Sequence, residues 1–407
     1  MNCRHCGAPV TLPFLDLGSA PPSNAYLDQA GLDAPETWFP LKVLVCERCW
    51  LVQTADHAGR EELFTADYAY FSSFSTSWLE HSRSYAQAMT ARFGLDAGST
   101  VVEVAANDGY LLQYFQAAGI PNYGVEPTAS TAAAARDRGI DVVERFFGVA
   151  LADELAADGR QADLMAANNV LAHVPDINDF VGGFARLLKP TGTATFEFPH
   201  LLRMVAENQF DTAYHEHYSY LSLTAVSRIF AANGLTIVDV QELPTHGGSL
   251  RVFAQRTDAG AAPQPAVAEL LAREEQAGIR TAGFYTAFQD VAVRVKQDLL
   301  RFLLDCRAQG LSVAAYGAAA KGNTLLNFAG VRPDLLSFVV DRNPAKAGRF
   351  MPGSHIPIRD EEALRAAQPD RVLLLPWNLR RELTEQLGYV RDWGGKLVVA
   401  VPQLEVV

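Results

Sequence analysis

The chain has 407 residues, of which 49% are hydrophobic and 20% charged, a balance typical of folded proteins and not of disordered ones. This length predicts two or three domains. The net charge of −12 argues against general nucleic-acid binding and against attachment to anionic lipid, because both require a basic face. No stretch approaches the roughly 18 apolar residues of a membrane span, and the first residues lack the apolar core of a signal peptide. We therefore expect a cytoplasmic enzyme with several domains, either a monomer or a small homo-oligomer.

Four of the five cysteines form two Cys-x-x-Cys pairs, Cys3 with Cys6 and Cys46 with Cys49. Such a turn points two thiolates at one place, and two turns together build a tetrahedral zinc site. Four thiolates leave no coordination position open, so the zinc is expected to be structural. The long gap between the pairs predicts a zinc ribbon with an inserted loop. The alternative, free thiols or a redox pair, does not explain the duplicated spacing. Cys306 differs, because it continues an apolar stripe at helical spacing and is expected to be a buried thiol.

From about residue 73 onward, strand-like and helix-like stretches alternate, which predicts doubly wound α/β domains with ligands at the carboxyl ends of the strands. Middle-domain strands are expected at residues 100–105, 123–125, 163–166, 193–198, 236–240 and 250–254. A linker near residues 256–265 precedes a smaller Rossmann-like unit with strands expected at 311–316, 337–340, 371–375 and 396–400. The predicted domains are a zinc-binding module at 1–72, a middle domain at 73–258 and a C-terminal domain at 259–407.

Polar residues follow several strands of the middle domain. The first strand contains Glu103 and runs into a loop ending at Gly109, which lacks the G-x-G-x-x-G pattern of a nicotinamide site. The second strand ends at Glu126, placed to accept both ribose hydroxyls of a nucleoside. This pattern resembles the S-adenosylmethionine site of class I methyltransferases, and the alternative is an α/β domain with an empty pocket. Phe146 could contact adenine or pack in the core. The expected cofactor residues are Glu103, Ala105, Asn107, Gly109, Glu126, Phe146, Asn168 and Asn169.

The segment from Phe210 to Tyr220 is the most unusual in the chain, because two histidines flank Glu216 among three tyrosines. A metal site is one interpretation, but His-x-His on an extended segment lacks a nearby third ligand. Acid–base chemistry is favoured, since a neutral imidazole accepts a proton near neutral pH. A polar surface loop with aromatic packing is the third interpretation.

With these motifs in place, the chain resembles the sugar-nucleotide C-methyltransferases, which methylate C3 of nucleotide-linked 4-keto-6-deoxyhexoses. The similarity covers nearly the whole chain, in the family's order: the four N-terminal cysteines and residues 68–73, 103–109, 169–176, 214–220, 246–251 and 316–323. It implies that a base removes the C3 proton, which the C4 ketone acidifies. The resulting enolate then attacks the methyl group of S-adenosylmethionine.

The resemblance also implies roles for individual residues. His217 is expected to be the base, with Glu216 orienting it or acting as the base instead. Tyr214, Tyr68 and His173 would hold the C4 oxygen and the C3 hydroxyl, although a histidine after an apolar strand, as His173 is, is as readily structural. The expected substrate-binding residues also include Tyr70, Ser72, Ser249, Arg251 and Asn323.

In the last domain, small residues from Gly317 onward and Lys321 lie between a strand and a helix. Backbone N–H groups at a helix N-terminus bind phosphate, and a lysine adds positive charge. We expect this domain to bind the diphosphate of a thymidine- or guanosine-linked sugar; a structural lid with a solvated Lys321 is the alternative. Two other functions stay open, an O- or N-methyltransferase for a related small molecule and a zinc-containing scaffold that binds a nucleotide sugar without turning it over.

Overall fold

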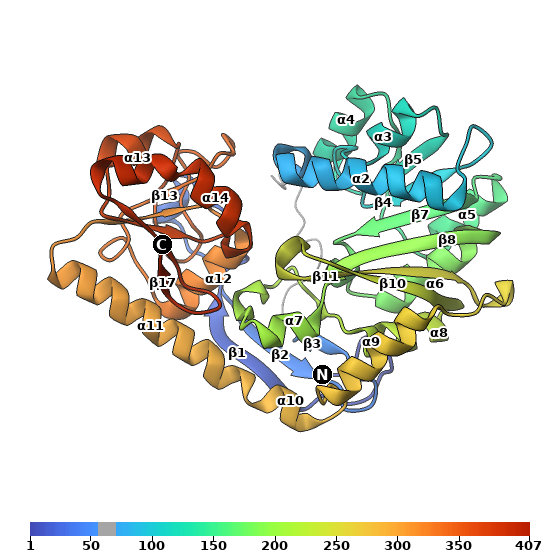
Figure 1. Ribbon diagram of the computed structural model, residues 1–407, viewed down its shortest axis with the longest axis horizontal. Coiled ribbons are helices and arrows are strands. Elements are labelled where there is room, and N and C mark those ends of the chain that lie inside the picture. Colours follow the sequence, from blue (N-terminus) through green and yellow to red (C-terminus); the bar gives the residue numbers. More distant parts are fainter. Residues whose placement is uncertain (56–70) are drawn as a thin grey trace.

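The computed structural model describes residues 1–55 and 71–407. They form three sheets of four, seven and six strands. In Figure 1 the seven-stranded domain lies on the right, the six-stranded domain on the left, and the N-terminal strands run along the bottom between them. The predicted fold class, a zinc-binding module followed by two Rossmann-like α/β domains, is confirmed.

The four-stranded sheet is antiparallel and has the order β1-β2-β3-β9. Its strands are β1 (Leu12–Ala20), β2 (Phe39–Val45), β3 (Val52–Thr54) and β9 (Ser219–Tyr220). A short 3-10 helix, η1 (Gly31–Asp33), lies in the segment between β1 and β2. Because β9 comes from the middle of the chain, the segment that carries His217 is tied to the zinc-binding module.

The seven-stranded sheet has the order β10-β11-β8-β7-β4-β5-β6, with β11 antiparallel to both neighbours and the other pairs parallel. Its strands are β4 (Val101–Val104), β5 (Asn122–Val125), β6 (Asp141–Val143), β7 (Ala162–Asn168), β8 (Leu188–Pro199), β10 (Leu235–Leu243) and β11 (Ser249–Arg256). All six expected strands are present. The strand order reverses between β4 and β7, and such a switch point opens a crevice for ligands.

Helices precede and separate these strands. The α-helices are α2 (Thr76–Phe93), α3 (Leu112–Ala117), α4 (Ala129–Asp137), α5 (Val149–Ala157), α6 (Ile177–Leu187), α7 (Leu201–Ala206) and α8 (Leu223–Ala232). The 3-10 helices are η2 (Ser72–Phe74), η3 (Leu171–His173), η4 (Phe210–Thr212), η5 (Thr245–Gly247) and η6 (Thr257–Ala259).

The six-stranded sheet has the order β14-β13-β12-β15-β16-β17, parallel except for β17. Its strands are β12 (Val313–Tyr316), β13 (Val339–Val340), β14 (Ile358–Arg359), β15 (Arg371–Leu374), β16 (Lys396–Val399) and β17 (Glu405–Val406). The helices of this region are α9 (Pro265–Gln276), α10 (Ala282–Thr286), α11 (Phe288–Ala308), α12 (Ala320–Ala329), α13 (Glu362–Ala367), η7 (Trp377–Leu379), α14 (Arg380–Gln386) and η8 (Gly388–Trp393). Strands lie at all four expected positions.

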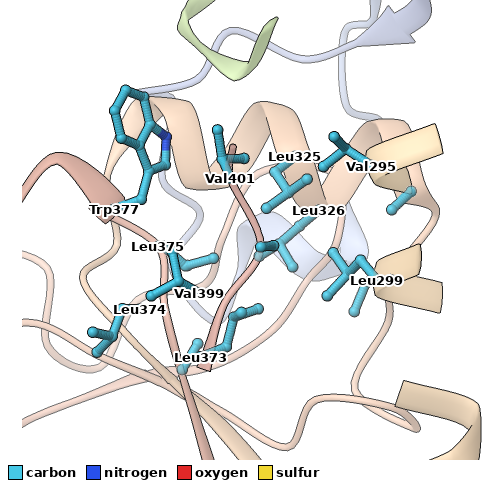
Figure 2. Close-up of a cluster of buried hydrophobic side chains, with 14 of the residues drawn as sticks. Val295, Leu299, Leu325, Leu326, Leu373, Leu374, Leu375, Trp377, Val399 and Val401 are labelled. Atoms are coloured by element: carbon cyan, nitrogen blue, oxygen red, sulfur yellow. The ribbon is translucent and has the colours of Figure 1, made fainter. Parts of the chain in front are cut away.

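The long helix α11 buries one face against the C-terminal sheet domain. Val295 and Leu299 of α11 lie beside Leu325 and Leu326 of α12 in the core (Figure 2). Each fully buried leucine or valine contributes about 1.5–3 kcal/mol to folding. Cys306, on the same face, is only 3% exposed, which confirms the expected buried thiol. Among the helices of the described ranges, none combines the length and the apolar character needed to cross a membrane.

Candidate active site

The two cysteine pairs come together in the N-terminal module. Their four Sγ atoms all lie within 4.8 Å of one another, with Cys3 and Cys49 separated by 3.4 Å and Cys6 and Cys46 by 3.5 Å. Zn–S bonds of about 2.3 Å in a tetrahedron place the sulfurs roughly 3.8 Å apart, so the cluster fits zinc. Four thiolates fill its coordination shell, which makes the site structural. Elsewhere in the part of the chain that the structure describes, no group of three or more metal ligands comes together, His215 and His217 included.

A cavity of about 470 Å³ lies where the carboxyl ends of the two Rossmann-like sheets face each other. The end of β7 and the loops after β4, β5 and β7 supply Ala105, Asn107, Glu126, Asn168 and Asn169. The segments that follow β12, β13 and β15, including the first turn of α12 and η7, supply Ala319, Ala320, Lys321, Lys346 and Asn378. The cavity is also lined by Asn24, Ser72, Trp78, Phe146, His173, Tyr214, His217 and His246. The cavity therefore gathers predicted cofactor, catalytic and substrate residues in one place.

Backbone strain is concentrated at this cavity. Eight non-glycine residues of the described chain have positive φ angles, and four of them line the cavity: Ala105, Asn107, Asn169 and His246. Their φ angles are 60°, 49°, 55° and 55°. Such conformations cost on the order of 1–3 kcal/mol and persist where the surrounding structure holds them, commonly at functional sites.

Glu126 forms the centre of the wall contributed by the seven-stranded sheet. Its Oε2 accepts the N–H of Asn107 at 2.9 Å, and its Oε1 accepts the N–H of Thr128 at 2.9 Å. Burial raises the pKa of this carboxyl, which is only 5% exposed. Each oxygen keeps a lone pair for a ligand hydroxyl, as the ribose of a nucleoside requires. The loop beside it favours Gly109, because its φ of 76° lies in a region that side chains rarely adopt.

The same wall carries buried polar atoms that no described residue pairs with. Within residues 1–55 and 71–407, neither side-chain amide atom of Asn168 nor Oδ1 of Asn169 has a hydrogen-bond partner. Buried polar groups are rarely left unpaired, so these amides mark the place of a polar ligand. Phe146 is 46% exposed at the cavity, whereas its neighbour Phe147 packs against Phe180 and Phe184 with ring centroids 5.8 and 5.1 Å apart.

Two histidines meet at the centre of the cavity. His217 donates its Nδ1–H to the carbonyl of Thr212 at 2.8 Å, and its Nε2 accepts the hydroxyl of Tyr214 at 2.7 Å. His173 donates its Nδ1–H to the carbonyl of Glu216 at 2.8 Å. A carbonyl only accepts, so both rings carry their proton on Nδ1 and leave Nε2 unprotonated. Burial lowers the pKa of His173 to about 4 and, with the neighbouring His173, lowers that of His217 well below its usual value.

Glu216 does not orient His217 as the sequence suggested. Its Oε1 instead accepts the backbone N–H and the side-chain Nδ2–H of Asn24, at 3.3 and 3.1 Å. Its Oε2 has no hydrogen-bond partner among the residues that the structure describes, and its side chain does not line the cavity. The carbonyl of Thr212 is the group that fixes the His217 ring.

The segment around His217 is held by all three parts of the molecule. Asp211 Oδ2 accepts the indole N–H of Trp377 at 2.8 Å, and the carbonyl of Ala213 accepts the hydroxyl of Thr324 at 2.9 Å. On its other side, β9 pairs with β3 of the zinc-binding module. Burial raises the pKa of Asp211 to about 6.

Two lysines line the wall contributed by the six-stranded sheet. Lys321, in the first turn of α12, donates to Asn378 Oδ1 at 3.0 Å, and burial lowers its pKa. Lys346 donates to the carbonyl of Ala318 at 2.8 Å and lies 3.5 Å from Asp341 Oδ2. Although burial opposes it, the neighbouring Tyr26 and Asp341 raise the pKa of Lys346. The two cations give this wall a positive charge suited to phosphate groups.

Some expected site residues lie away from the cavity. Glu103 is fully buried on β4, where burial raises the pKa of its carboxyl well above the usual value. Ser249 donates to the carbonyl of Thr245, and Arg251 forms an ion pair with Glu197 at 2.5 Å. The residues that the structure does not bring to the cavity surface are Glu103, Gly109, Glu216, Ser249, Arg251 and Asn323.

Ser72 does line the cavity, and its N–H donates to Asn107 Oδ1 at 2.9 Å. Tyr68 and Tyr70 lie outside the described residues. The cavity residues that sequence reasoning missed include Asn24, Trp78, His246 and Lys346. The position of Lys346 could have been predicted, because it follows the strand that ends at Asp341. Asn24 lies in the inserted loop between the cysteine pairs, where no sequence pattern indicates a site.

Three family descriptions match the chain in succession. "Putative zinc binding domain" covers residues 3–64, "Methyltransferase domain" covers 78–240, and "C-methyltransferase C-terminal domain" covers 244–402. C-methyltransferase NovU of Streptomyces niveus is 36% identical over 406 residues, which cover 100% of this chain and 96% of NovU.

Two solved methyltransferase structures each match less than half of the chain. Magnesium protoporphyrin IX methyltransferase from Synechocystis PCC 6803, with bound S-adenosylmethionine, is 17% identical with a TM-score of 0.34, and the match covers 44% of this chain and 79% of that one. An S-adenosylmethionine-dependent methyltransferase from Clostridium acetobutylicum ATCC 824 is 9% identical with a TM-score of 0.34, covering 44% of this chain and 92% of that one.

The similarity to NovU runs through the zinc-binding module and both Rossmann-like domains without a break. The cavity supports the same conclusion, because its strained loop beside Glu126 and its amide atoms without described partners fit S-adenosylmethionine. The chain therefore belongs to the C-methyltransferase family, and it is an enzyme that uses S-adenosylmethionine to methylate carbon.

Proposed function

We propose that the enzyme transfers the methyl group to C3 of a nucleotide-linked 4-keto-6-deoxyhexose in deoxysugar biosynthesis. One observation carries the proposal: a single cavity joins a carboxylate-and-amide wall, a histidine–tyrosine centre and a wall with two lysines. A carbon acid beside a ketone needs a base and a donor to its developing oxyanion. A nucleoside diphosphate needs cations.

In this proposal each wall holds one ligand. Glu126 accepts the ribose hydroxyls of S-adenosylmethionine, Phe146 contacts its adenine, and the free amide atoms of Asn168 bind its polar groups. Lys321 and Lys346 face the diphosphate of the sugar nucleotide from the opposite side. The hexose then lies between them, against His217.

His217 removes the C3 proton. Its Nδ1–H is held by Thr212, so Nε2 is the basic atom, and the incoming sugar displaces the Tyr214 hydroxyl from it. Tyr214 then donates to the C4 oxygen, where the enolate charge develops. Because its Nε2 is also unprotonated, His173 accepts from the C3 hydroxyl and does not donate to the C4 oxygen. The bound S-adenosylmethionine supplies the methyl group that the C3 carbanion accepts.

Mass spectrometry of the reaction products tests the proposal. The purified enzyme is incubated with S-adenosylmethionine and a panel of thymidine- and guanosine-diphosphate 4-keto-6-deoxyhexoses. The expected product is one methylene heavier, with the new methyl on C3, and appears with one of the two nucleotides. Turnover with none of the panel, or a methyl group on oxygen or nitrogen, would contradict the proposal.

A further inference from the structure

The loop between the two cysteine pairs reaches far beyond the zinc-binding module. Residues 21–38, the arm, leave the module between β1 and β2 and attach to the C-terminal domain. The Tyr26 hydroxyl donates to the carbonyl of Ala318 at 2.6 Å. Leu27 and Phe350 exchange two backbone hydrogen bonds of 3.1 and 2.8 Å. The arm is thus fixed across the side of the catalytic cavity.

Asn24 is the residue of the arm that lines the cavity. Its backbone N–H and side-chain Nδ2–H both donate to Glu216 Oε1, at 3.3 and 3.1 Å. Glu216 directly precedes His217 in the chain, and Asn24 and His217 both line the cavity. These two bonds also fix the amide's orientation, because its NH₂ group must face the carboxyl oxygen.

With its NH₂ group on Glu216, the Asn24 amide has its Oδ1 atom available to another partner. Among the described residues, no hydrogen bond to this oxygen is formed. An amide carbonyl accepts hydrogen bonds and cannot donate them, so it favours an O–H group over a ketone or a methylene at the facing position. A hexose held beside His217 offers hydroxyl groups, whereas S-adenosylmethionine is expected at the wall that carries Glu126.

We propose that Asn24 is a specificity-determining residue whose Oδ1 accepts one hydroxyl of the substrate sugar. The zinc-binding module thereby takes part in sugar selection, through the arm. Glu216 acts as a positioning residue that aims the Asn24 amide. This inference rests on the proposed function, because it needs a sugar nucleotide in the cavity.

The test measures binding of sugar nucleotides by calorimetry, which does not depend on turnover. The panel contains the preferred 4-keto-6-deoxyhexose nucleotide and analogues that each lack one hydroxyl. The proteins are the wild type, Asn24→Ala and the control Gln29→Ala, which changes an exposed residue of the same arm. Affinity for S-adenosylmethionine checks that each variant is folded, and Asn24→Ser replaces Asn24→Ala if the latter loses that affinity.

We expect Asn24→Ala to weaken binding of the complete sugar nucleotide by about 3- to 10-fold, the effect of one hydrogen bond. For the analogue that lacks the recognised hydroxyl, wild type and Asn24→Ala should bind equally, while Gln29→Ala behaves as wild type throughout. Equal weakening for every analogue, or none for any, would overturn the inference alone. Absence of binding of any sugar nucleotide to the wild type would overturn the proposed function as well.

Discussion

The two Rossmann-like domains hold the loop after their first strand in the same way. In each domain, a carboxylate that follows the second strand, β5 or β13, accepts a hydrogen bond from a backbone N–H of the loop that follows the first strand, β4 or β12. Glu126 accepts from Asn107 at 2.9 Å, and Asp341 accepts from Ala318 at 2.8 Å. The acid thereby fixes the loop that faces the cavity in both domains.

The two acids differ in what they present to the cavity. The Glu126 carboxyl lines it, whereas Asp341 does not and lies 3.5 Å from Lys346, which does. One domain therefore offers an acceptor for hydroxyl groups, and the other offers cations. The side chains at the strand ends therefore set the class of ligand, because the parallel strands that carry them are arranged alike in the two domains.

Replacing His217 should slow methyl transfer without weakening the binding of either ligand. His217→Ala is expected to slow methyl transfer about 100- to 10,000-fold, because a positioned base contributes that much. Affinities for S-adenosylmethionine and for the sugar nucleotide should stay near wild type, since His217 belongs to neither wall. Single-turnover rates and calorimetry measure the two effects. His215→Gln is the matched control, because His215 lies in the same segment but contacts the carbonyl of Phe39. Near-normal turnover by His217→Ala would show that His217 is not the base.

Lys321→Met tests the cationic wall. The sugar nucleotide should bind about 10- to 100-fold more weakly, the cost of losing a hydrogen bond to a charged group. The difference from wild type should shrink as salt is added. Binding of S-adenosylmethionine should not change. Lys396→Met serves as control, because Lys396 is exposed and does not line the cavity. A loss confined to S-adenosylmethionine would reverse the assignment of the two walls.

Glu126→Gln tests the opposite wall. One carboxylate oxygen becomes an NH₂ group that cannot accept the N–H of Asn107 or Thr128, nor a ribose hydroxyl. We expect the affinity for S-adenosylmethionine to fall about 10-fold, with the affinity for the sugar nucleotide unchanged. Calorimetric titration with each ligand measures both. Glu154→Gln, an exposed residue on α5, should leave both affinities intact. Weaker binding of both ligands would mean that the walls are not independent.

The smallest expected effect concerns pH. Removal of the C3 proton requires unprotonated His217, and burial lowers the pKa of this ring well below 6.5. The rate of methyl transfer should therefore persist as pH falls through 6.5 and decline only in more acidic solution. Single-turnover rates between about pH 5 and 8 check this, since that range contains the ordinary titration of histidine. A rate that halves close to pH 6.5 would show that the catalytic base is not buried as described.

Much of the framework was readable from the sequence because it depends on local pattern. Strand periodicity placed β4, β5 and β12, and the doubled Cys-x-x-Cys spacing predicted the zinc cluster. Glu126 and Lys321 were found because each follows a strand at the edge where ligands bind. β6, at three residues, is too short to give a periodic signal of its own.

The rest depends on contacts between distant segments. Arg251 lies in a matched motif, yet β11 pairs it with Glu197 on β8, and that ion pair holds it away from the cavity. Asn24 reaches the cavity only because the arm crosses to the C-terminal domain, and nothing in its local sequence indicates that path. Glu216 and His217 are neighbours in sequence, but their side chains have different partners.

The most direct test of carbon-acid chemistry is exchange of the C3 hydrogen in heavy water. The enzyme is supplied with S-adenosylhomocysteine in place of the methyl donor and with the sugar nucleotide that it methylates. Wild type should incorporate deuterium at C3, His217→Ala should not, and Lys321→Met should do so at higher sugar-nucleotide concentration. If wild type methylates the sugar but fails to exchange C3, or if His217→Ala exchanges it at the wild-type rate, proton removal by His217 is contradicted.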